Sequence, residues 1–283
     1  MKRARSVGFR VAALVASCLL SGGAFGAGFQ LYNEGSAEAL ALGAAISARR
    51  DLLSNTWYNP AALAGSEKKG LSLGVTFVAP SYTYDAGGPE GEQVLEQDLH
   101  YLPHINYVHP LTDKWTAMLS VNVPYGLGTE WDKGYLRSLY TQPEFLGTPP
   151  YYRDGVSGLP QQIYLMAPYI TPSIGYRVND QLSVAAGLSL VYAQFYLENI
   201  VTPLAMRSPP YGPGYPTDEM EYEGSGYGVG YVLAAHYQFN EDWAAGLAYH
   251  SPVNVELEGD TDFHYTGLRS EERRVGKECG LLC

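Results

Sequence analysis

Residues 27–63 read AGFQLYNEGSAEALALGAAISARRDLLSNTWYNPAAL, and the rest of the chain is organised around them. The first half of this stretch is rich in Ala and Leu and predicts a short helix within residues 36–48. In the second half, Pro60 lacks a backbone donor and biases Asn59 away from helix. The stretch does not alternate in polarity, although a long series of alternating segments follows it. A compact apolar segment of this kind fits inside a closed sheet, and we predict that residues 27–69 form a plug.

Seven segments after the plug alternate between apolar and small or polar side chains, which is the pattern of β-strands. In the first of them, Leu71, Leu73 and Val75 point one way and the residues between them point the other. Most of the segments exceed the ~5–6 residues usual in soluble proteins and reach the roughly 9–11 that a tilted membrane strand needs. The segments are 71–79, 98–109, 114–126, 163–178, 182–196, 227–239 and 243–257.

Aromatic positions and connection lengths favour a membrane barrel over a soluble sandwich. Aromatic girdles are formed by Tyr and Trp at strand ends on the apolar face, and the candidates are Trp115, Tyr125, Tyr227 and Trp243. Short turns alternate with long loops, as they do in outer-membrane barrels; the turns are 110–113, 179–181 and 240–242, and the loops are 85–97, 127–162 and 199–225. We therefore predict an all-β fold, a transmembrane antiparallel β-barrel, with about seven of its strands in residues 70–268.

The N-terminus has the three parts of a cleaved secretory signal peptide over residues 1–26. Basic residues precede an apolar run at 11–20, and small residues lead to Gly26. The run is much shorter than the ~20 residues of a spanning helix. A lipoprotein signal with an acylated Cys18 is the alternative, but this cysteine lies inside the apolar run. Between residues 27 and 268 there is no cysteine, so we predict neither a disulfide framework nor a thiolate metal site.

The composition bounds the partners of the chain. Its 283 residues carry a formal net charge of −11, and 17% are charged, against roughly 25% in ordinary soluble domains. An acidic chain without basic runs outside its termini is not expected to bind nucleic acid. Residues 269–283 have no alternation and an unrelated composition. We interpret them as a non-native tail, with a genuine charged tail as the alternative.

Several short motifs, taken together, resemble the FadL/TodX family of outer-membrane transporters for hydrophobic compounds. They are AGFQL at 27–31, NPA at 59–61, PYGLGTE at 124–130, and the stretches 173–193 and 226–246. Each motif is short, but their order after a signal peptide makes the set specific. The resemblance covers residues 27–265, roughly the first half of a family member.

The resemblance implies a 14-stranded barrel with a plugged lumen in the bacterial outer membrane. Family members move long-chain fatty acids or aromatic hydrocarbons passively into the barrel, then sideways into lipid beside a kinked third strand. The matching residues here are Asn122, Pro124, Tyr125 and Gly126. Proline removes a ladder hydrogen bond and glycine weakens a strand, so we expect the lateral exit there. The alternative is that Pro124 ends the strand at the membrane boundary.

The resemblance also assigns roles within the plug and at the substrate head group. Apolar plug residues would border the pocket, and Asn59 would hydrogen-bond the barrel wall; the plug candidates are Phe29, Leu31, Trp57, Asn59, Pro60 and Ala61. Fatty-acid importers of the family carry a basic residue near the end of the fifth strand, where this chain has Asn199. We therefore expect a neutral or aromatic substrate, with a loop cation such as Arg153 or Arg207 in place of that residue as the alternative.

Other functions are weighed against transport. The lumen-facing histidines, His100, His104, His236 and His250, are interpreted as solvated polar filler, so we predict no enzyme, no metal and no cofactor. Acidic residues near the outer rim, Asp85, Asp98 and Glu130, are interpreted as solvated charges rather than a Ca²⁺ site. A general porin or a surface adhesin remains the alternative. The predicted partners are hydrophobic small molecules and outer-membrane lipid, and the predicted state is a monomer.

Overall fold

The computed structural model describes residues 30–31, 35–85, 91–96, 99–134, 136, 158–201, 218–264 and 279–282. The chain divides into two compact units, Met1–Gln30 and Leu31–Cys283, and of the first only Gln30 is described. The predicted signal peptide and Phe29 therefore lie outside the described residues, as do Arg153 and Arg207. Among the described residues, no helix is long and apolar enough to cross a membrane.

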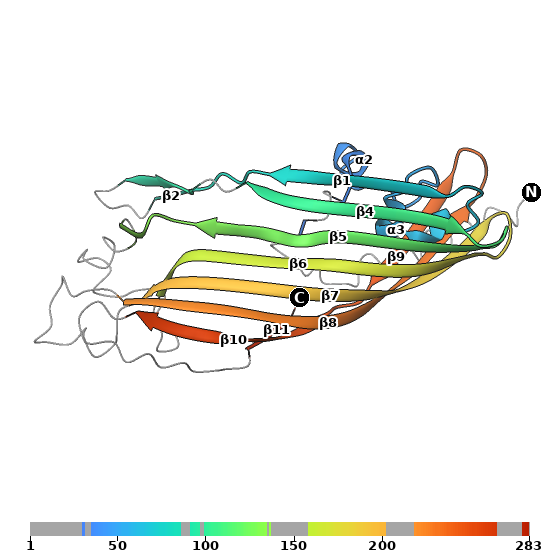
Figure 1. The fold of residues 1–283 in the computed structure, drawn as a ribbon. Coiled ribbons are helices and arrows are strands. Elements are labelled where there is room, and N and C mark those ends of the chain that lie inside the picture. Colours follow the sequence, from blue (N-terminus) through green and yellow to red (C-terminus); the bar gives the residue numbers. More distant parts are fainter. Residues whose placement is uncertain are drawn as a thin grey trace, which may run out of the picture. The chain divides into compact units, whose positions relative to one another are not determined.

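The second unit consists mainly of antiparallel strands (Figure 1). They are β1 (Gly70–Val78), β2 (Thr83–Asp85), β3 (Glu92–Val94), β4 (His100–Pro110), β5 (Trp115–Glu130), β6 (Gly158–Arg177), β7 (Leu182–Val201), β8 (Asp218–Gln238), β9 (Ala244–His250), β10 (Asn254–His264) and β11 (Cys279–Leu282). One sheet has the order β1-β4-β5-β6-β7-β8-β10-β11, with β9 also paired to β8. A separate hairpin, β2 with β3, overlaps the region predicted as the first long loop, 85–97.

The two faces of the sheet have the polarity of a membrane barrel rather than of a soluble protein. On one face of β1, Leu71, Leu73 and Phe77 are 59%, 66% and 62% exposed. The buried positions of the opposite face on β4 and β5 are largely polar, and include His100, His104, Asn106, Thr116, Ser120 and Asn122. Apolar side chains that face outward need lipid around them, whereas inward polar side chains line a lumen. The structure thus confirms the predicted transmembrane antiparallel barrel fold.

A short helical segment precedes the sheet and packs against its inner face. It comprises α2 (Ala37–Ala41), α3 (Asn55–Tyr58) and the 3-10 helix η1 (Pro60–Leu63). Ser36 is the N-cap of α2, because its Oγ accepts a hydrogen bond from the Ala39 amide in the first turn. Pro60 is the first residue of η1. An N–H at this position would have no partner within the helix, so proline is tolerated there. Helix α3 contacts β4 and β5, and η1 contacts β6, β7 and β8. Two short helices that touch five strands require the sheet to curve around them.

The segment 243–257 is not the single strand that the sequence predicts, so this prediction is wrong. It is divided into β9 and β10, and its apolar residues do not share one face: Leu247 is 73% exposed, whereas Val255 is 2% exposed. Pro252 lies at the break and has no N–H to continue the ladder. The glycines of β8 leave room for the inward turn, since a Cβ added to Gly228 would lie 2.8 Å from Val255 Cγ2.

Other strand ends also differ from the prediction. β5 continues to its end at Glu130 and β6 begins at Gly158, so the connection predicted at 127–162 is shorter. The β7–β8 ladder extends without a shift to the pair of Val201 with Asp218, which shortens the next loop. The first residues of β8 read DEMEYE over 218–223, so acidic side chains alternate there with Met220 and Tyr222, a short strand signal that the prediction did not use. Within the tail predicted as non-native, β11 pairs with β10; its foreign origin stays a prediction.

Candidate ligand site at an interrupted ladder

β5 contains a β-bulge where the sequence predicts a kink. Asn122 pairs with Tyr169 of β6, and Tyr125 pairs with Ala167, so two residues of β5 oppose one of β6. One of these two is Pro124, which has no N–H and cannot complete a regular ladder; a bulge accommodates it. β5 continues for several residues beyond this point. Pro124 therefore interrupts the strand and does not end it.

The bulge reverses the face on which the following residues lie. Asn122 is buried before the bulge, and Val123 and Tyr125 are also buried, at 8% and 9% exposed. An extra residue shifts a period-two pattern by one position. The prediction that Tyr125 belongs to the lipid-facing girdle is therefore wrong. Its ring lies inside, with its centroid 6.4 Å from that of Tyr169.

The ladder between β4 and β5 stops beside this bulge. Its last pair is Ile105 with Val121. Beyond this pair, residues 100–104 of β4 pair with β1, and the end of β5 pairs with β6. Side chains occupy the space between the strands, because a Cβ added to Gly126 would lie 2.5 Å from Leu102 Cδ2. Among the described residues, these two strand ends are thus joined by side-chain packing without a backbone ladder.

A small pocket lies at this point and joins the plug to both strands. The Leu31 amide donates to the Pro124 carbonyl at 2.7 Å. Trp57 of α3 is 4% exposed, and its ring meets that of Tyr169 edge to face at 5.6 Å. The structure therefore brings together four of the predicted site residues. Tyr125 does not line the pocket, but its ring contacts that of Tyr169. The pocket is lined by Leu31, Trp57, Leu102, His104, Asn122 and Pro124, among others.

Two pocket residues carry buried polar atoms that have no hydrogen-bond partner among the described residues. Asn122 is 3% exposed, and neither its Nδ2 nor its Oδ1 has a partner. His104 Nδ1 is likewise buried and unpaired. An unpaired buried polar group costs roughly 1–3 kcal/mol, so such groups are expected where a ligand or an ordered water completes their bonds. The open space between these groups is about 10 Å³, which is roughly the room that one water molecule needs, so a larger ligand requires the surrounding side chains to move.

Asn59, Pro60 and Ala61 lie outside the pocket and join the plug to the wall. Asn59 Nδ2 donates to the Ser47 carbonyl at 2.6 Å and to the Ala235 carbonyl of β8 at 3.2 Å. Its Oδ1 accepts from the Ala61 amide at 3.1 Å. Asn59 and Ala61 are completely buried. The Asn-Pro-Ala motif therefore forms a fixed corner of the plug and not a ligand contact.

We expect Asn59→Ala to lower the free energy of unfolding by about 3 kcal/mol, because three hydrogen bonds are lost and two buried carbonyls lose a donor. Urea unfolding of the full-length protein in detergent measures this. The matched control is Asn179→Ala, whose Oδ1 accepts two backbone hydrogen bonds in an exposed turn. Equal losses in the two variants would contradict the role of Asn59.

Sequence reasoning missed two further contacts between plug and wall. Thr56 Oγ1 donates to Asn106 Oδ1 at 2.8 Å, and both residues are buried. His236 Nε2 lies 3.0 Å from the carbonyl of Ala48. Polar residues at alternate positions of a strand were the available signal, because an inward polar side chain needs a partner. His236 therefore binds the plug and is not mere solvated filler.

Asn199 is not part of the pocket. It pairs with Pro160 and Met220 near the ends of β7 and its neighbours, and its Oδ1 has no partner among the described residues. Nine residues along β6 separate Pro160 from Tyr169, which is roughly 30 Å of strand. Any role of Asn199 in binding a head group thus concerns an outer site, separate from the pocket at the bulge.

Residues 70–74 read GLSLG and match the G-x-S-x-G pattern of hydrolase nucleophile elbows. In the structure they belong to β1, which pairs with β4 over its whole length. An elbow needs a sharp strand-to-helix turn that exposes the serine. Ser72 instead lies in a regular ladder opposite Asn106, so this motif does not form an elbow.

The fold and the site together define a class of protein, an outer-membrane β-barrel with an internal plug and an interruption in its wall. The family model described as outer membrane protein transport protein (OMPP1/FadL/TodX) matches residues 17–143 and 155–273. The chain belongs to this family, which confirms the resemblance seen in its motifs and its location in the outer membrane.

Individual relatives agree with this assignment. The chain is 26% identical over 266 residues to the long-chain fatty acid transport protein of Escherichia coli O6:H1, covering 87% of this chain and 55% of that protein. It is 26% identical over 201 residues to outer membrane protein P1 of Haemophilus influenzae, covering 64% and 39%. The chain thus spans about half the length of the curated relatives it matches.

Solved structures show the same fold. A Pseudomonas aeruginosa FadL homologue matches with a TM-score of 0.59 and 20% identity, covering 84% of this chain and 56% of the other. The Ralstonia pickettii toluene transporter TbuX matches with a TM-score of 0.55 and 20% identity, covering 89% and 64%. At this identity the likeness concerns the fold alone.

Proposed function

We propose that the full-length protein carries hydrophobic molecules, fatty acids or aromatic hydrocarbons, passively across the outer membrane. The ligand enters the pocket at the β5 bulge and leaves sideways into lipid between β4 and β5. The observation that carries this proposal is the end of the β4–β5 ladder at Ile105 and Val121, beside a pocket shared by the plug and both strands.

The interrupted ladder supports a lateral exit on energetic grounds. Separating two strands in hydrocarbon normally breaks backbone hydrogen bonds that find no other partner there. Past Ile105 only side chains, chiefly Leu102 against Gly126, need to move. An apolar ligand that passes directly into lipid keeps its surface out of water, which is worth about 25 cal/mol per Å². The route requires no energy source.

The polar groups favour a neutral or weakly polar ligand. Position 199 carries an amide where fatty-acid importers of the family carry a basic residue, and the pocket itself offers the neutral amide of Asn122 and the ring of His104. The proteins similar to this chain include both a long-chain fatty acid transport protein and a toluene transporter. We therefore propose aromatic hydrocarbons as the better ligands of this member.

Displacement of a fluorescent long-chain fatty acid from the full-length protein in detergent tests this proposal. We expect toluene-like aromatics to displace the probe more effectively than unlabelled fatty acids do. Asn199→Lys should tighten fatty-acid binding roughly tenfold, or about 1.4 kcal/mol, whereas Asn179→Lys in an exposed turn should not. Preference for fatty acids in the unchanged protein would reverse the proposed substrate, and absence of specific binding would refute transport.

A further inference from the structure

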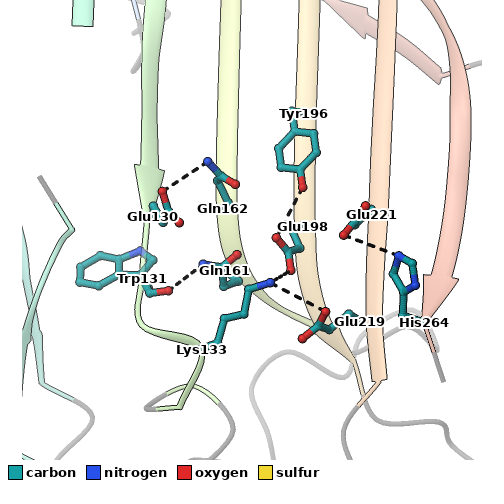
Figure 2. Close-up of polar contacts among 10 residues, drawn as sticks. All are labelled: Glu130, Trp131, Lys133, Gln161, Gln162, Tyr196, Glu198, Glu219, Glu221 and His264. Atoms are coloured by element: carbon teal, nitrogen blue, oxygen red, sulfur yellow. Dashed lines mark hydrogen bonds and ion pairs between the residues drawn. The ribbon is translucent and has the colours of Figure 1, made fainter. Parts of the chain in front are cut away.

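Three carboxylates converge near the ends of β7 and β8 that adjoin the long connections (Figure 2). Glu198 of β7 and Glu219 and Glu221 of β8 offer oxygens that all lie within 4.8 Å of one another. Glu198 is 4% exposed. The Lys133 ammonium forms a hydrogen bond to Glu198 and lies 3.8 Å from Oε2 of Glu219. One lysine faces three acids, so these four side chains keep an excess of two negative charges.

A buried amide oxygen faces the same cluster. Gln161 is 2% exposed and is the bulge residue of β6 next to Glu198 of β7. Its Nε2 donates to the carbonyl of Trp131 at 2.9 Å. Because a carbonyl only accepts, this bond fixes the orientation of the amide and turns Oε1 away from Trp131, toward Lys133 and Glu198 (Figure 2). Oε1 is buried and has no partner among the described residues.

The cluster lies beyond the hydrocarbon part of the barrel. The ring of Tyr192 packs at 5.0 Å against that of Tyr227, which is 80% exposed on the lipid-facing side. Such aromatic pairs mark the membrane boundary. Glu198 follows Tyr192 by six residues, roughly 20 Å along the strand. The carboxylates are therefore reached by water and dissolved ions.

Lys133 is held in its charged form by the cluster. Burial alone would lower the pKa of its ammonium, but the hydrogen bond and charge of Glu198, with the charges of Glu219 and Glu221, outweigh burial and raise the pKa above its ordinary value of 10.5. At neutral pH the lysine therefore competes with any other cation.

We propose that Glu198, Glu219, Glu221 and Gln161 Oε1 form a binding site for a divalent cation, best filled by Ca²⁺, and that Lys133 is the group displaced. Ca²⁺ takes about 6–8 oxygens from carboxylates, amide carbonyls and water, whereas Mg²⁺ demands a near-ideal octahedron. A doubly charged ion also balances the excess charge of the cluster. The ion would connect the outer ends of β6, β7 and β8. This site does not depend on the proposed transport.

Tb³⁺ luminescence on the full-length protein tests the site directly. The protein in detergent is stripped with EDTA, desalted and titrated with Tb³⁺, which emits when a nearby tyrosine is excited. The Tyr196 hydroxyl lies 3.4 Å from Oε2 of Glu198. We expect saturable emission that Ca²⁺ displaces, with Mg²⁺ weaker by roughly tenfold or more. Absence of saturable emission would overturn the proposal.

Two variants and a control separate a cation site from a simple ion pair. Glu198→Gln removes one charged ligand and should weaken Tb³⁺ binding roughly tenfold or more. Lys133→Met removes the competitor and should tighten binding by a similar factor, with a Tm that Ca²⁺ raises. Glu241→Gln, in an exposed turn, should change neither. If Glu198→Gln does not fold, Lys133→Met alone tests the site. A Tm that is lowered in Lys133→Met and that Ca²⁺ does not restore would show that the cluster is an ion pair and not a cation site.

Discussion

The Gly246→Val substitution is expected to dislodge the plug and to raise the ion conductance of the full-length protein roughly tenfold or more. Gly246 of β9 faces the plug so closely that an added Cβ would lie 2.1 Å from the Ser47 carbonyl oxygen and 2.6 Å from Asn59 Nδ2. Neither group can move freely, because the two are hydrogen-bonded to each other. Overpacking of this kind typically costs about 1–3 kcal/mol or more, and moving the plug relieves it.

Single-channel recording in planar bilayers measures this effect, and entry of large hydrophilic antibiotics into cells reports it independently. The matched control is Ala245→Val, which adds a side chain to the neighbouring residue on the exposed face of the same strand. The control should leave the conductance unchanged. Equal conductance in Gly246→Val and the unchanged protein would show that the plug does not seal the lumen.

Deletion of Pro124 is expected to abolish most ligand transport while the barrel still folds. The deletion removes the extra residue between Asn122 and Tyr125 and gives β5 and β6 a continuous register. The side chains of Asn122 and Tyr125 still point inward in the variant, because each of these residues already pairs with an inward residue of β6. Without the bulge, the ladder between β4 and β5 is free to continue beyond Ile105 and Val121. Each added ladder bond would oppose lateral exit by about 1 kcal/mol.

Uptake of labelled ligand by cells that produce the protein measures this loss, which should exceed roughly tenfold. Heat-modified migration on gels confirms that the variant is folded. Pro172→Ala is the control, because Pro172 lies opposite Leu119 in an unshifted part of the same ladder. Uptake that survives the deletion would refute the lateral exit at the bulge.

The faces of most strands could be predicted because lipid and lumen select opposite polarity at alternate positions. The prediction held wherever the register was regular, as for Leu71 and Leu73 of β1. It was wrong for Tyr125 and for Val255, where a proline interrupts the ladder and the residues that follow turn inward. The sequence marks the proline, but whether a strand ends, bulges or divides there depends on how the neighbouring strand pairs.

The pocket was predictable only in part. Leu31 and Trp57, predicted in the plug, and Asn122 and Pro124, predicted at the lateral exit, line one pocket; nothing in their spacing places them together, and their roles stay predictions. The acidic cluster was not foreseen, since Glu219 and Glu221 fell in a predicted loop. Their spacing of two residues puts both on one face only if the segment is a strand. Glu198, on another strand, then joins them through a long-range register.

The length of the central strands sets how far the barrel extends beyond the membrane. β6, β7 and β8 contain 20, 20 and 21 residues, and at about 3.3 Å per residue each is roughly 65 Å long. Tilted by about 40°, they reach a height of roughly 50 Å, twice the ~25 Å apolar band of an outer-membrane barrel. About half of the height of these three strands therefore lies outside the apolar band. For the proposed transport, this length means that a hydrophobic molecule would meet protein before lipid and would cross the polar layer along these strands.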